Sequence, residues 1–80
     1  MLRLHEIVKM GLATKDQFVQ DLKMTIQEPD RYYDSYHGQQ WIRNYERGFP
    51  YGIIHIQAKF ISPSYGFEVK DYYVLESHPV

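Results

Sequence analysis

Four histidines are the side chains of this sequence best suited to acid–base chemistry, because imidazole exchanges its proton near neutral pH. They are His5, His37, His55 and His78. Their spacing gives neither a helical i, i+4 pair nor the short interval of a zinc site, and the chain has no cysteine. The sequence also has no serine nucleophile turn and no glycine-rich phosphate loop. We therefore predict a non-enzymatic protein that has no catalytic residues, metal ligands or cofactors.

A tyrosine-rich segment is the most distinctive local feature of the chain. Tyrosine offers a large amphipathic contact area at low entropic cost, and together with arginine it is enriched at binding hot spots. The alternative is that these rings close a small core. On the first interpretation the partner-binding residues are Arg31, Tyr32, Tyr33 and Tyr36, with a second patch formed by His55, Tyr65 and Tyr73.

Composition restricts the classes of partner and location. Lys plus Arg is 9 and Asp plus Glu is 10, so the net charge of −1 predicts neither a strongly cationic nucleic-acid binder nor an acidic mimic of nucleic acid. The first residues have charges among their apolar side chains, unlike a signal peptide, and no apolar run approaches transmembrane length. We expect a cytoplasmic protein without a membrane partner.

Two helices are expected before Pro29. Leu4, Ile7 and Val8 follow helical spacing, and Gly11 can supply the left-handed residue that ends a helix. Thr14 followed three residues later by Gln17 has the form of a capping box, which predicts the start of a second helix. Its buried stripe would consist of Phe18, Val19, Leu22 and Ile26, although alternation at residues 22–26 leaves a short strand as a rival interpretation.

The middle of the chain is predicted as a loop followed by a third helix. Turn-forming residues and tyrosines mix over residues 29–38, which favours a loop with helical turns. Trp41, Ile42, Tyr45 and Phe49 then recur at helical spacing, and the Gly and Pro at positions 48 and 50 provide a stop. The sequence therefore predicts a helix over residues 39–47.

An antiparallel hairpin is expected in the C-terminal half. Ile54, Ile56, Ala58 and Phe60 alternate with polar residues, and a second alternating run begins at Phe67 after a turn cluster at residues 62–65. Pairing Ile61 with Gly66 places Phe60 opposite Phe67, Ala58 opposite Val69 and Lys59 opposite Glu68. A β-bulge at residues 70–71 would then bring Tyr72 and Val74 onto the apolar face.

These elements predict one α+β domain over residues 1–80, in which N-terminal helices pack against a C-terminal antiparallel β-hairpin. Because two strands alone are marginally stable, the small sheet could be completed by a partner chain, including a second copy in a homodimer. Eighty residues leave little room for a preorganised pocket but can supply an interface of ordinary size. We therefore predict a small binding protein that regulates or inhibits a protein partner, a profile that by analogy fits a phage or mobile-element accessory protein.

Two alternatives stay open at this stage. Three helices followed by a hairpin permit a winged-helix arrangement, which would bind nucleic acid through Arg43, Arg47 and Lys59. A more distant alternative is a small metal-independent nuclease that uses His37 or His55.

Overall fold

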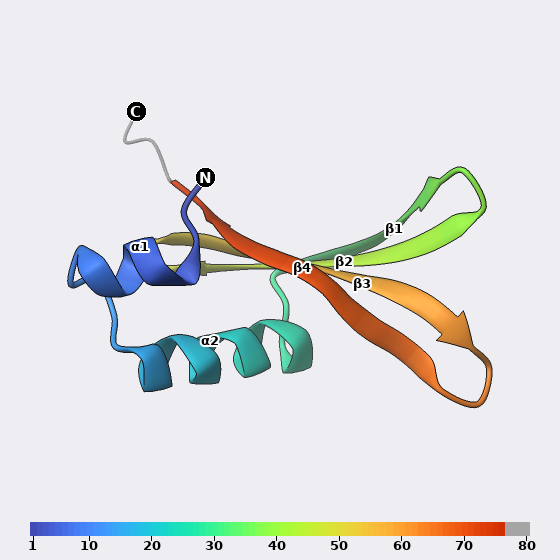
Figure 1. The fold of residues 1–80 in the computed structure, drawn as a ribbon, viewed down its shortest axis with the longest axis horizontal. Coiled ribbons are helices and arrows are strands. Elements are labelled where there is room, and N and C mark those ends of the chain that lie inside the picture. The colour runs from blue at the N-terminus through green and yellow to red at the C-terminus, as the bar shows by residue number, and fades with distance from the viewer. Residues whose placement is uncertain (77–80) are drawn as a thin grey trace.

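The structure is a computed structural model that describes residues 1–76, so His78 lies outside the described residues. Two short helices precede a four-stranded antiparallel sheet in which consecutive strands are neighbours, as Figure 1 shows. The elements are α1 (Leu4–Lys9), α2 (Lys15–Gln27), β1 (Arg31–His37), β2 (Gln40–Phe49), β3 (Gly52–Ser62) and β4 (Gly66–Leu75). The helices come first and the strands follow, as predicted. The sheet, however, is a four-stranded meander, so the predicted fold with a sheet of only two strands is wrong.

The predicted third helix is strand β2, and the predicted loop before it is strand β1. In β2, side chains alternate between Trp41, Arg43 and Tyr45 on the sheet face toward the helices and Ile42 and Asn44 on the back face. Arginine resembles a polar residue in a hydrophobicity pattern, yet its stem and guanidinium cover aromatic rings here. This role of arginine concealed a two-residue period that was present in the sequence.

A tight turn joins β1 to β2. His37 pairs with Gln40, which leaves Gly38 and Gln39 as the connecting residues. Gly38 has φ of 67°, a left-handed conformation that two-residue hairpin turns need and that glycine adopts without a steric penalty.

The helix signals are largely confirmed. Gly11 ends the first helical segment with φ of 71°. The Thr14 hydroxyl accepts a hydrogen bond from the Gln17 backbone N–H at 3.1 Å, as an N-cap should. The helix then continues through the residues for which a strand was the rival interpretation.

The buried face of α2 differs from the prediction. Phe18 is buried as expected, but Asp21 and Thr25 are buried as well, whereas Ile26 is exposed. The Asp21 carboxylate accepts a hydrogen bond from the Tyr51 hydroxyl at 2.5 Å, which offsets the cost of burying it. Burial, together with this hydrogen bond, raises the pKa of Tyr51 above its ordinary value.

The hydrophobic core lies between the helices and one half of the sheet. Its buried members are Leu2, Ile7, Phe18, Ile54, Ile56 and Val74. Phe18 lies at the centre and contacts the rings of Tyr51 and Tyr72 at centroid distances of 6.2 and 6.3 Å. The helices therefore stabilise the half of the sheet that holds the β2–β3 turn.

The predicted pairing of the two C-terminal runs is confirmed. Phe60 pairs with Phe67 and Lys59 with Glu68, and Lys70 is an extra residue between the pairs made by Val69 and Asp71. The predicted bulge is therefore present, and it places Tyr72 and Val74 on the helix side. Near the turn the prediction is off by one residue, because the partner of Gly66 is Ser62 and not Ile61.

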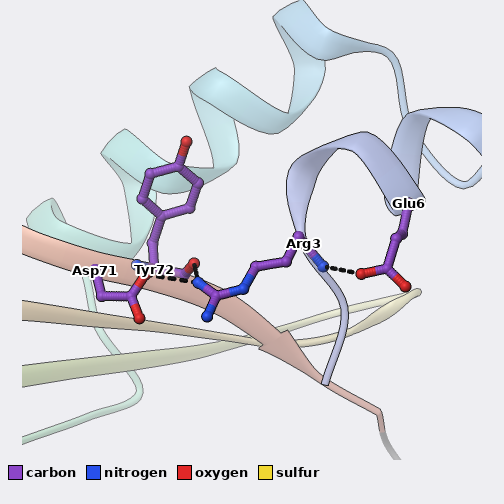
Figure 2. Close-up of polar contacts among 4 residues, drawn as sticks. All are labelled: Arg3, Glu6, Asp71 and Tyr72. Carbon is purple, nitrogen blue, oxygen red and sulfur yellow. Dashed lines mark hydrogen bonds and ion pairs between the residues drawn. The ribbon is translucent and has the colours of Figure 1, made fainter.

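The N-terminus is tied to β4 at the edge of the sheet. Leu2 and Val74 exchange two backbone hydrogen bonds, each 2.8 Å long. Figure 2 shows the Arg3 guanidinium on the Asp71 carboxylate and the Tyr72 carbonyl, at 2.6 and 3.2 Å, while the Arg3 backbone N–H donates to Glu6. Together these contacts hold α1 against the last strand.

The other half of the sheet extends beyond the helices. Figure 1 shows the β1–β2 and β3–β4 hairpins diverging toward their turns, on the side away from α1. The pairing of β2 with β3 stops at Ile42 and Lys59, whereas both hairpins continue further. We call this diverging half of the sheet the fork.

Candidate functional site

Aromatic side chains gather on the helix-side face of the fork. We call this set the aromatic surface; its members are Tyr32, Tyr36, Trp41, Arg43, Phe60 and Phe67. Strand periodicity places them together, because each occupies the same face of its strand as the core residues of the other half of the sheet. The core of the protein thus continues as a partly exposed apolar surface where the helices end.

The rings of the aromatic surface contact one another. Trp41 lies at the centre, with centroid distances of 5.1 Å to Phe60 and 5.0 Å to Phe67. Tyr36 stacks on the other side of the indole at 6.4 Å. Tyr36 and Tyr32 are 66% and 56% exposed, so large apolar areas face solvent around a packed centre. Such a rigid aromatic centre can contact a partner at a low entropic cost.

Arg43 joins the aromatic surface to a charge pair. Its guanidinium carbon lies 4.4 Å from the Phe67 ring centroid and 5.4 Å from that of Tyr32. Its Nε donates to the Asp34 carboxylate of the adjacent strand at 3.0 Å. This hydrogen bond lowers the pKa of Asp34 and raises that of Arg43. The pair gives the surface a polar member without a net charge.

A second cluster lies on the back face of the sheet. We call it the histidine cluster; it consists of Tyr33, Asn44, Glu46, His55 and Tyr73. His55 is 5% exposed, and its Nε2 lies 3.1 Å from the Asn44 side-chain oxygen. Its Nδ1 lies 2.8 Å from a Glu46 carboxylate oxygen, although the direction of the N–H is unsuited to a hydrogen bond.

Aromatic rings bury this imidazole. The Tyr73 ring stacks on His55 at 5.1 Å, and the Tyr33 ring meets it edge-on at 6.4 Å. Burial raises the pKa of Tyr73, and nearby groups including Tyr33 and Glu46 raise it further. Because both ring nitrogens of His55 face protein acceptors and the ring is covered, the cluster is suited to fixing the register of the strands.

The structure divides the tyrosine-rich segment predicted as one binding site. Tyr32 and Tyr36 lie on the aromatic surface, whereas Arg31 and Tyr33 lie on the back face, where the Arg31 guanidinium covers the Tyr33 ring at 4.5 Å. Alternation along β1 causes this division. The second predicted patch divides as well, because His55 and Tyr73 stack on the back face while Tyr65 is exposed near the β3–β4 turn.

The alternative nucleic-acid residues do not form one surface. Arg43 binds Asp34, and Arg47 donates to the Glu28 carbonyl at the end of α2. Lys59 lies on the back face, opposite Glu68. The winged-helix interpretation also loses its recognition helix, because residues 40–49 form β2.

The two histidines of the nuclease alternative are separated as well. His37 is exposed at the turn end of β1, whereas His55 is buried beside the ring of Tyr33. Residues 1–76 hold no group of three or more His, Asp or Glu side chains arranged to bind a metal. In the same residues, neither helix has the length and apolar character needed to cross a membrane.

Sequence reasoning missed three central residues of the aromatic surface: Trp41, Phe60 and Phe67. All three were assigned to the core, Phe60 and Phe67 from an alternation that the sheet confirms and Trp41 from a helical spacing that strand β2 contradicts. The periodicity could not show how far the helices extend along the sheet, and they end before they reach the fork. The alternation of aromatic residues and arginine in β2 was the available signal.

Comparison of this chain with protein-family models, curated proteins and solved structures finds no match. The proposals below therefore depend on the geometry just described.

Proposed function

We propose that this chain is a small non-enzymatic binding protein that regulates or inhibits a protein partner, and that the aromatic surface is its interface. The observation that carries the proposal is a packed Trp41 centre surrounded by exposed tyrosines, in a half of the sheet that extends beyond the helices. Contiguous apolar surfaces of this kind on folded proteins commonly mark interaction sites.

The composition of the surface supports a protein partner. Tryptophan, tyrosine and arginine are the residues most enriched at hot spots, and this surface contains all three in mutual contact. The Asp34–Arg43 pair adds directional hydrogen-bonding groups at its edge. We place the interaction in the cytoplasm, where the absence of cysteine is no disadvantage.

Single-stranded nucleic acid is the competing ligand, because bases also stack on aromatic residues of a sheet. Such surfaces combine the rings with a cationic groove, and here the arginine of the surface is paired with Asp34. We therefore favour protein and treat nucleic acid as an outcome of the test.

The test is a quantitative pull-down from host-cell lysate, followed by titration calorimetry with the recovered partner. Tyr32→Ala combined with Tyr36→Ala should weaken binding by about thirtyfold, the effect of losing one hot spot of about 2 kcal/mol. Met24→Ala, an exposed apolar change on α2, is the matched control and should bind as the unmodified chain does.

Circular dichroism must show that all variants fold. Equal recovery of the partner by the tyrosine variant and by the control would refute the proposal. Recovery of nucleic acid that is released by moderate salt would replace the proposal with the competing one.

A further inference from the structure

A groove beside α1 is separate from the aromatic surface. It is an open groove of about 530 Å³, within the size range of ligand sites, and is lined by Leu4, His5, Val8, Lys9 and Lys15. Figure 1 shows α1 at one end of the molecule and the hairpin turns at the other. A ligand in this groove would therefore leave the fork accessible.

The lining of the groove combines an apolar floor with positive charge. Leu4 and Val8 supply the apolar part, and Val8 is 42% exposed. Lys9 and Lys15 supply two ammonium groups, and neither forms an ion pair within residues 1–76. The five lining residues include no carboxylate, so the charged groups of the lining are both positive and can pair with anionic groups of a ligand.

Two further apolar side chains are exposed where the chain leaves α1 for α2. Met10 and Leu12 are 60% and 41% exposed. Methionine adapts its shape to different apolar partners, which suits a surface that receives a peptide. The apolar floor beside the two lysines favours a segment that carries apolar side chains as well as carboxylates over a small anion.

We propose that the α1 groove binds an acidic segment of a protein partner, with an apolar side chain over Leu4 and Val8 and carboxylates at Lys9 and Lys15. Charge complementarity selects the occupant, and the apolar floor distinguishes it from an ordinary acidic tail. With the fork at the opposite end, the chain would hold two protein segments at once.

The probe is a fluorescein-labelled synthetic peptide that alternates glutamate and leucine, compared with one that alternates glutamate and serine. Fluorescence polarisation should show binding of the first peptide at least about tenfold tighter than the second. Lys9→Gln with Lys15→Gln should weaken that binding by about tenfold. Lys23→Gln with Lys70→Gln removes the same charge elsewhere and should leave it unchanged.

Amide chemical-shift mapping locates the site independently. Shifts should concentrate between Leu4 and Lys15 and should persist in the Tyr32→Ala, Tyr36→Ala variant, which separates this proposal from the one for the aromatic surface. Three outcomes would overturn the α1 groove proposal: no measurable binding of the glutamate–leucine peptide, equal loss in both lysine variants, or equal affinity for both peptides. Binding only to vesicles of phosphatidylglycerol and phosphatidylcholine would assign the groove to an anionic lipid surface instead.

Discussion

At the scale of single residues, Gly52 is the glycine with the least room for a side chain. Its φ of 143° lies in a region that side chains rarely adopt. A Cβ there would also lie 2.6 Å from the Leu75 carbonyl oxygen and 2.7 Å from a Val74 methyl group. The unfavourable φ and the close contacts both occur where β3 begins to pair with β4. The paired strands therefore cannot move apart to accommodate a side chain at this position.

Gly52→Ala should therefore lower the free energy of unfolding by about 2 kcal/mol or more, from backbone strain and steric overlap together. Urea unfolding followed by circular dichroism measures the change. Gly38→Ala is the matched control, since Gly38 also has a positive φ but open space around its Cβ position, and it should cost about 1 kcal/mol. Equal losses in both variants would show that the predicted contact with β4 is not made.

At the scale of elements, the attachment of α1 to β4 depends on a charge pair. The hydrogen bond from Arg3 lowers the pKa of Asp71 below its usual value. A carboxyl group whose pKa is lower in the folded state stabilises the fold above its unfolded pKa of about 4, and this stabilisation is lost as the pH falls through the folded value. The Arg3–Asp71 pair should therefore make stability sensitive to acid.

Asp71→Asn tests this sensitivity. The variant should be less stable at neutral pH, by no more than about 1 kcal/mol because both side chains are about 40% exposed and water screens them. Its stability should fall less than that of the unmodified chain as the pH is lowered, so that the two curves converge. Urea midpoints across the acid range measure this, and parallel curves would contradict it.

At the scale of the whole molecule, the two halves of the sheet have different roles. Phe18 is fully buried between α2 and the half of the sheet that carries the core, whereas Trp41 is half-buried in the fork. Loss of a buried aromatic core side chain costs about 3–5 kcal/mol, a large share of the stability of a small domain.

Phe18→Ala should therefore unfold most of the protein, and Trp41→Ala should cost less than half as much while abolishing partner binding. Thermal unfolding and the calorimetric titration measure the two effects. A larger loss of stability in Trp41→Ala than in Phe18→Ala would show that the fork, not the helix-covered half, carries the core.

The sequence predicted local features well and the extent of the sheet poorly. The Thr14 cap and the bulge near Lys70 follow from interactions between nearby residues or from one strongly alternating pair of strands, and both are present. Strands β1 and β2 were missed because arginine and tyrosine obscure the contrast between apolar and polar residues on which periodicity depends. The Asp21 carboxylate accepts one hydrogen bond from Gln17, one helical turn earlier, and another from Tyr51, a distant residue that no local pattern reveals.

The candidate site was predicted in part. Tyrosine content directed attention to Tyr32 and Tyr36, which lie on the aromatic surface, and His55 and Tyr73 were expected in one patch and do stack on each other, although His55 is buried. The division of the β1 side chains between the two faces of the sheet could be predicted only if residues 31–37 were first recognised as a strand. The extent of the uncovered surface depends on where the helices end relative to the strands, which is a property of the tertiary structure.

The extra residue at Lys70 lets a single strand meet two different requirements. Before it, Phe67 belongs to the fork; after it, Tyr72 and Val74 belong to the core, all on one face of the sheet. Pairing Lys70 in a regular ladder would reverse the orientation of every later side chain, sending Val74 to solvent and Tyr73 inward, whereas deleting Lys70 would remove the bulge and leave those side chains on their present faces. A change in chain length that alters no side chain's orientation is therefore possible at two places in the β3–β4 hairpin, at Lys70 and in the exposed connection at residues 63–65.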